Sequence, residues 1–251
     1  MKSQRTDLSI FSKFNFDSKP VGVKFLLGKP EGIKKLDKQM PLCQMIKEAH
    51  LQGAPFYATV DNEDCFGRVP MGWVDTPPFG EAGYVGEELE IFQEARANSR
   101  IYVHAPKLSR GVVNYIVFSP FDQLTFEPDL LFVLATPSQA EIVMRAMTYS
   151  TGEIYESKSA NVLACAWLFT YPFQTGKVNF VTTGLGFGTK ARQIFAEGQI
   201  LISIPFDWIP TIANNLKEMK WVLPSYTDGK DKFPLRAQKV HEDLAKKYMN
   251  P

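Results

Sequence analysis

The fold is clearest at Leu130-Leu-Phe-Val-Leu-Ala135-Thr136-Pro137-Ser138-Gln139-Ala140. The unbroken apolar run from Leu130 to Ala135 has the length of a buried strand. Thr136 is a typical N-cap residue, and Pro137 suits the first helical position. A helix is therefore expected from Ser138 to Tyr149, directly after the strand.

Similar patterns predict the other elements on both sides of this junction. Pro41 to Gln52 has apolar residues at helical spacing and ends at Gly53, which favours a helix. Further strands are expected at Val21–Leu27, Pro55–Val60, Arg100–His104, Val112–Phe118, Asn161–Phe169, Val178–Thr183 and Gln199–Ile204. Further helices are expected at Leu8–Phe14, Glu87–Asn98, Lys190–Ala196, Asp207–Met219 and Leu235–Tyr248. Because strands neither alternate regularly with helices nor segregate from them, we predict an α+β fold with a mixed, largely antiparallel sheet and flanking helices.

Length and composition indicate an ordinary globular protein. The 251 residues are sufficient for one domain spanning 1–251, and the best internal boundary would be the segment 119–128. The net charge of +1 provides no general attraction for nucleic acid or an anionic membrane. No apolar run has the length of a signal peptide core or a membrane helix. These features predict a cytoplasmic protein that binds neither nucleic acid nor membrane. They leave its oligomeric state open.

Three cysteines are the strongest candidates for chemistry. A reducing compartment and an odd count both argue against disulfides. Cys43 lies near the start of the predicted helix, where the helix dipole favours a thiolate. Cys65 follows three nearby acidic residues, which are expected to raise its pKa. Cys165 lies in an apolar run and, taken alone, suits a small core residue. The spacing is not that of a zinc ribbon or ferredoxin, so a metal site requires three distant segments to meet.

A glycine-rich loop is the second candidate. It runs Gly184-Leu-Gly186-Phe-Gly188-Thr-Lys190-Ala-Arg192, between a predicted strand and a predicted helix. Such a loop can present backbone N–H groups to an anion, and Lys190 and Arg192 would add positive charge. It matches neither the dinucleotide fingerprint nor the phosphate-binding P-loop. A simple flexible connection between strand and helix therefore remains an alternative.

Several short motifs in order along the chain resemble the uncharacterised ArCR family, a domain of unknown function found mainly in archaea and anaerobic bacteria. These motifs are Pro20–Phe25, Pro41–Ala49, Asp64–Gly67, Pro128-Asp129, Pro137–Ala140, Cys165, Gly186–Gly188 and Ile202–Pro205. The resemblance assigns no reaction. Because all three cysteines fall in these motifs, it implies a shared site. It also implies a fourth cysteine in the loop before a G-x-R element, but Gly184 to Lys190 contains none.

Two hypotheses follow. In the first, Cys43, Cys65 and Cys165 hold an iron–sulfur cluster or metal ion, and the loop from Gly184 to Arg192 binds a small anionic ligand beside it. One iron would then be free for substrate, solvent or another ligand. In the second, the protein is a metal-free small-molecule binding module with a pocket between the aromatic, Gly/Pro-rich loop Met71–Tyr84 and the glycine loop, and the cysteines are structural. A purely structural interaction protein is a third reading. The sequence does not decide whether the protein is an enzyme.

Overall fold

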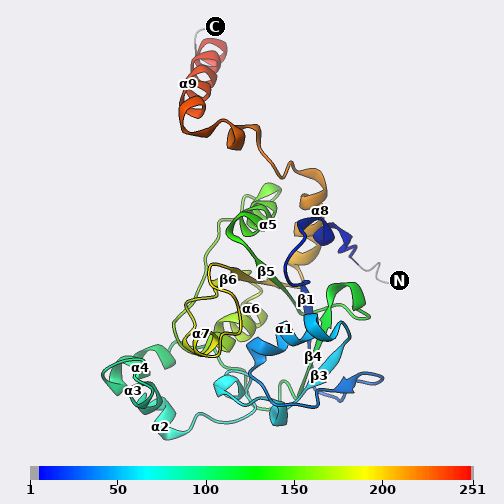
Figure 1. Ribbon diagram of the computed structural model, residues 1–251, viewed down its shortest axis with the longest axis vertical. Helices are drawn as coiled ribbons and strands as arrows, with labels where there is room; N and C mark the ends of the chain where they lie inside the picture. Colours follow the sequence, from blue (N-terminus) through cyan, green and yellow to red (C-terminus); the bar gives the residue numbers. More distant parts are fainter. Residues whose placement is uncertain (1–5, 250–251) are drawn as a thin grey trace. The chain divides into compact units, whose positions relative to one another are not determined.

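The computed structural model describes residues 6–249, and it has the predicted α+β architecture (Figure 1). The strands are β1 (Val21–Leu26), β2 (Lys34–Lys35), β3 (Phe56–Ala58), β4 (Tyr115–Pro120), β5 (Leu130–Ala135), β6 (Asn179–Thr182) and β7 (Ile200–Pro205). The α-helices are α1 (Leu42–Gln52), α2 (Pro78–Glu81), α3 (Tyr84–Glu88), α4 (Ala95–Tyr102), α5 (Pro137–Tyr149), α6 (Tyr171–Thr175), α7 (Phe187–Ala191), α8 (Trp208–Glu218) and α9 (Gly229–Tyr248). Shorter helical turns are η1 (Ser9–Phe14), η2 (Val60–Asn62), η3 (Phe66–Arg68), η4 (Phe121–Gln123), η5 (Ala166–Thr170) and η6 (Pro224–Thr227).

The strands form a single seven-stranded sheet in the order β2-β3-β4-β1-β5-β7-β6. Only β2 and β3 pair in parallel, and every other neighbouring pair is antiparallel. The prediction of a mixed, largely antiparallel sheet is therefore confirmed. The central strands β1, β4 and β5 carry most of the buried sheet surface.

The main core lies between the sheet and α1. The apolar face of α1 is formed by Leu42, Met45, Ile46 and Ala49, all of which are buried. These side chains belong to one cluster with alternate residues of the strands, including Val21, Val23, Phe25, Phe118, Leu130 and Phe132. Burial of this face is the main force that fixes α1, and with it Cys43, on the sheet.

The junction between β5 and α5 forms as predicted. The Thr136 side chain accepts a hydrogen bond from the backbone N–H of Gln139, and the backbone N–H of Thr136 donates to Oε1 of Gln139. This reciprocal capping box starts α5 at Pro137. Since all six residues of β5 are buried, the strand is covered on both faces, and α5 packs against β5 and β7.

The predicted strand at Asn161–Phe169 is wrong. Leu163 has a positive φ of 55°, which turns the chain, and a helical segment follows that contains η5 and continues into α6. The segment is buried: Ala166, Leu168 and Phe169 are at most 2% exposed. A continuous apolar run suits a buried helix as well as a buried strand, and this ambiguity explains the error.

The segment after β3 also differs from the prediction. The expected helix at Glu87–Asn98 is divided between α3 and α4, with Glu90 at a positive φ of 53° between them. The expected strand at Arg100–His104 is instead the end of α4. We call the segment from Pro78 to Tyr102, which contains α2, α3 and α4, the cap. The cap forms its own group of short helices in Figure 1.

The chain divides into two compact units, one ending at Lys217 and the other beginning at Glu218. The segment 119–128 therefore lies inside the first unit, which contains the whole sheet. The second unit contains η6 and α9, and α9 has no buried residue in the part of the chain that the structure describes. Within residues 6–249, no helix is long and apolar enough to cross a membrane.

Candidate functional site

Cys43 is the second residue of α1. Pro41 precedes the helix in an extended conformation, and Leu42 and Cys43 begin the first turn. The Cys43 side chain is 4% exposed and belongs to the main core cluster. Packing of α1 against β1 and β4 therefore fixes the first turn of the helix, and with it the Cys43 thiol, against the sheet.

Cys65 is presented by the loop that follows β3. Thr59 and Asn62 form a capping box at η2, and Cys65 is the N-cap residue immediately before η3. The side-chain amide of Asn62 donates hydrogen bonds to the carbonyl groups of Leu36 and Lys38, and these bonds attach the loop to the segment before α1. The loop is thus fixed beside the start of α1, where Cys43 lies.

Cys165 is placed by the helical segment that replaces the predicted strand. It follows the turn at Leu163 and immediately precedes η5. The side chain is 7% exposed and belongs to the same core cluster as Cys43. A strand would have pointed alternate residues to opposite faces, whereas the helical turn directs Cys165 toward α1.

The three thiols line one cavity of about 580 Å³. The neighbouring Cys43 thiol and burial raise the pKa of Cys165 well above its ordinary value. Burial also raises the pKa of Cys65, with a further contribution from the Glu63 carboxyl. The predicted direction for Cys65 is confirmed, although burial is a larger cause than its acidic neighbours. The structure thus brings together three cysteines that are separated by 22 and 100 residues in sequence.

Glu63 is the important residue that sequence reasoning missed. Its carboxylate accepts hydrogen bonds from the backbone N–H groups of Leu42 at 2.5 Å and Cys65 at 3.0 Å, and also from that of Gly67. The residue is fully buried, and this burial raises the pKa of Glu63 to about 7. One carboxyl group therefore joins the backbone next to Cys43 to the backbone of Cys65. Its position in Glu63-Asp-Cys65-Phe-Gly67, close to both a cysteine and a glycine, could have indicated this role. From the sequence, we considered only the effect of nearby acidic residues on the pKa of Cys65.

Gly67 makes room for this carboxyl group. A Cβ atom at position 67 would lie 2.8 Å from Cδ and Oε1 of Glu63, closer than such contacts normally are. Gly67→Ala is therefore expected to displace Glu63 and to lower the free energy of unfolding by about 1–3 kcal/mol.

Chemical denaturation of purified protein measures this effect, and Gly188→Ala is the control. A Cβ atom at Gly188 meets nothing within 4 Å, and Gly188 lies inside α7, where alanine is the better helix former. Equal stability of Gly67→Ala and the wild-type protein would contradict the role assigned to Glu63.

The glycine loop closes another side of the cavity by packing against the Cys165 segment. The backbone N–H of Phe187 donates to the carbonyl oxygen of Asn161 at 2.7 Å. A Cβ atom on Gly186 would lie 3.3 Å from that of Ala164 and 2.8 Å from the hydroxyl of Thr189. Glycine at this position therefore permits the close approach of α7 to the residues just before Cys165.

The five loop residues that we predicted to bind an anion do not all face the cavity. Gly188 and Arg192 line it, whereas Gly184, Gly186 and Lys190 are not among its lining residues. Lys190 instead pairs with Glu197 at 3.3 Å. The N–H groups of Phe187 and Lys190 are already bonded to backbone carbonyls, so Arg192 is the loop's main group for binding an anion.

Arg192 lies at the rim of the cavity. Its guanidinium contacts the Asp64 carboxylate at 3.1 Å, immediately beside Cys65. Partial burial opposes the charge on Arg192, but Asp64 and the thiols of Cys65 and Cys43 raise its pKa. Arg192 thus adds positive charge near Cys65 and Cys43, which favours their thiolate forms.

The donor set determines which kind of metal group would suit the cavity. Over residues 6–249, no three or more His, Cys, Asp or Glu side chains are arranged to hold a single metal ion. Cys43, Cys65 and Cys165 all line the cavity, and thiolates are the soft ligands that iron–sulfur clusters require. The thiolate ligands of an iron–sulfur cluster are distributed over several iron atoms, so they need not converge on one point. The donor type of the three cysteines therefore suits iron–sulfur ligation.

The fold and this cavity define an α+β protein with a site formed by three cysteines, and comparison with known proteins places it in a family. The chain belongs to the family described as uncharacterised ArCR, whose profile matches residues 9–215. It is 26% identical over 195 residues to the uncharacterized protein MJ0308 of Methanocaldococcus jannaschii, covering 77% of this chain and 83% of that protein. No solved structure shows significant similarity. The family match ends close to Lys217, where the first compact unit ends.

Proposed function

We propose that this protein binds an iron–sulfur cluster through Cys43, Cys65 and Cys165, and that a small anionic ligand binds beside it near Arg192. The observation that carries the proposal is the meeting of all three cysteines of the chain at one cavity. Three unrelated core cysteines would have no reason to meet in this way.

The surroundings of the thiols support this proposal. Arg192 provides positive charge beside the sulfur atoms, and Glu63 anchors the backbone next to two of the three cysteines. The cavity is large enough for a ligand as well as the sulfur groups, since small-molecule sites typically measure about 300–1,000 Å³.

The chain's own residues would share the work at such a site. A bound cluster with three thiolate ligands would supply electron transfer or Lewis-acid chemistry at its open iron. Arg192 would orient an anionic group of the ligand, and the cap residues that line the cavity would exclude water from it. Glu63 would act as a positioning residue, because its contacts are to backbone N–H groups rather than to the cavity.

Anaerobic reconstitution tests the proposal. Purified protein is incubated under nitrogen with ferrous iron and sulfide and then desalted, and protein-bound iron and the visible absorption spectrum are measured. We expect several iron atoms per chain and broad sulfur-to-iron absorption. Protein that retains no iron after this treatment would overturn the metal proposal.

A metal-free binding module is the second candidate. It is favoured by the apolar character of the cavity, whose walls include Val69, Val74, Phe79, Leu89 and Ile91. In that case triple replacement of the cysteines by alanine would leave both folding and ligand affinity unchanged.

A further inference from the structure

The lining of the cavity combines charged and apolar residues. The three thiols, Arg68 and Arg192 lie among its polar lining residues, and Asp64 is its one acidic lining residue among the residues described. The cap contributes the apolar residues Phe79, Val85, Leu89 and Ile91 and the phenol of Tyr102. A ligand that matched both kinds of lining residue would have a charged group and an apolar body.

The charge of the lining favours an anion. Two arginines face one aspartate, so the cavity has a net charge of +1 when its thiols are protonated. Asp64 contacts one terminal nitrogen, Nη1, of Arg192, and the Arg192 side chain is 41% exposed. A guanidinium has five N–H donors in a planar fork, so Arg192 has donors left for a second carboxylate.

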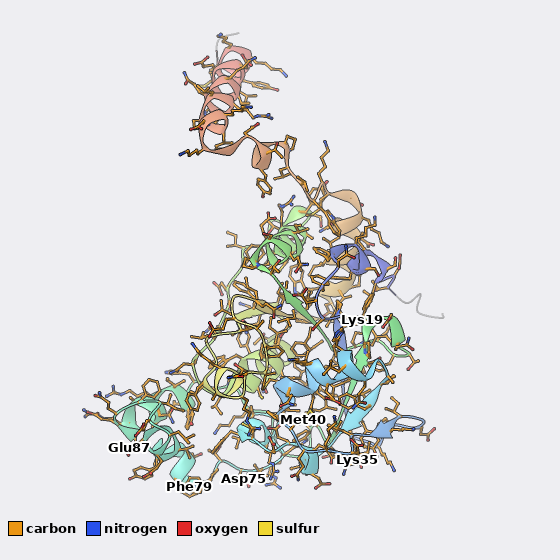
Figure 2. All side chains as sticks on the ribbon, viewed as in Figure 1. Lys19, Lys35, Met40, Asp75, Phe79 and Glu87 are labelled. Atoms are coloured by element: carbon orange, nitrogen blue, oxygen red, sulfur yellow. The ribbon has the colours of Figure 1, made fainter. Side chains whose placement is uncertain are left out.

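The cap supplies a surface for the apolar body. Phe79 and Leu89 both line the cavity, yet they are 54% and 52% exposed. Phe79 lies on α2, and Glu87 lies nearby on α3 (Figure 2). Large apolar side chains that stay exposed at the wall of a cavity gain most from a ligand that covers them.

Polar contacts lie within the cap and beside its two ends. Ser99 donates to the carbonyl oxygen of Glu81 within the cap, and Lys107 contacts Thr76 at 2.7 Å just before it. Arg110 and Asp75, the residue before Thr76, form an exposed ion pair at 3.0 Å (Asp75 is labelled in Figure 2). Exposed pairs of this kind contribute little to stability.

We propose that the ligand is a monocarboxylate with an aromatic or branched aliphatic body, bound with its carboxylate on Arg192 and its body beneath Phe79 and Leu89. The inference deepens the proposed function, from which it takes only the position of the anionic group. It does not require a cluster. A cavity of about 580 Å³ accommodates a body of this size.

Titration calorimetry on the full chain tests the ligand class. The probes are 3-phenylpropanoate and 4-methylpentanoate, their neutral alcohols, and acetate, each measured under nitrogen with reduced, iron-free protein. At least one of the two acids is expected to bind saturably and about tenfold or more tightly than its alcohol, and acetate is expected not to saturate. Absence of binding by both acids, or equal binding of acid and alcohol, would overturn the proposal.

Two variants locate the site. Arg192→Gln is expected to weaken acid binding about tenfold or more without changing the affinity of the alcohol, because only the charged contact is lost. Arg145→Gln is the matched control, since Arg145 also pairs with a carboxylate, at 2.8 Å, but lies on α5 away from the cavity. Unchanged acid affinity in Arg192→Gln would contradict the assigned anchor.

The same titration on iron-reconstituted protein separates the two proposals. Acid binding without bound iron would reject the cluster and retain the ligand class. Bound iron without acid binding would reject the ligand class and retain the cluster.

Discussion

Glu63→Ala is expected to lower the free energy of unfolding by about 3 kcal/mol, because it leaves buried N–H groups at Leu42, Cys65 and Gly67 without an acceptor. Each buried donor without a partner costs about 1–3 kcal/mol. The same change frees the backbone beside Cys43 and Cys65, so we also expect iron retention after reconstitution to decrease. Urea denaturation at pH 5 and an iron assay measure the two effects.

Glu87→Ala is the matched control for this variant. Glu87 is an exposed glutamate on α3, and its replacement should change stability by less than about 0.5 kcal/mol. A Glu63→Ala protein as stable as the Glu87→Ala protein would show that the carboxyl group does not hold the two segments together.

Glu63 also predicts a pH dependence in the iron-free protein. Burial raises its pKa from 4.5 to about 7, so the native state binds the proton more tightly than the unfolded state does. The stabilisation is complete below pH 4.5, decreases as the pH rises, and is lost above about pH 7. Since one pKa unit corresponds to about 1.4 kcal/mol, the total change is about 3 kcal/mol.

Denaturation curves between pH 4.5 and 8 measure this change. The decrease should be absent from the Glu63→Ala protein, which has no carboxyl group at this position. An equal decrease in both proteins would assign the effect to other groups.

Replacement of any one of the three cysteines by alanine is expected to have the largest effect on metal content. Changes to groups that merely support metal ligands reduce affinity about 10–100-fold, so loss of a ligand should reduce it at least as much. Iron retained by reconstituted Cys43→Ala, Cys65→Ala and Cys165→Ala proteins after desalting measures the effect.

Met147→Leu is the control for loss of a buried sulfur atom. Met147 is 6% exposed and lies on α5, away from the cavity lining, so its replacement should leave iron retention unchanged. Thermal melting of each variant separates loss of iron from loss of fold. A folded Cys165→Ala protein that retained full iron would remove Cys165 from the ligand set.

Local signals were sufficient for much of the fold. The capping residues Thr136 and Pro137 identified the start of α5, and Gly53 identified the end of α1, because these residues act on the backbone next to them. Prediction failed at Asn161–Phe169, where an apolar run has the same composition whether it is a helix or a strand. That segment carries Cys165, so the error concerned the site directly.

The site itself depended on long-range contacts that sequence spacing does not encode. The cysteine motifs suggested a common site, but only packing of α1 and the helical turn at Cys165 brings the thiols to one cavity. The role of Glu63 required knowledge that its carboxyl group is buried among three backbone N–H groups. The loop Met71–Tyr84 was expected to line a pocket, and Phe79 does line the cavity. The contribution of Tyr102 on α4 was not predicted, because Arg100–His104 was expected to be a strand.

The most direct test of the central claim is the iron and acid-labile sulfide content of the full chain purified without oxygen. We predict that both are present, with more than one iron per chain and sulfide in comparable amount, because three thiolates would hold a cluster rather than a single ion. Protein that contains neither iron nor sulfide, and does not acquire them on reconstitution, would contradict this account and make the three cysteines structural.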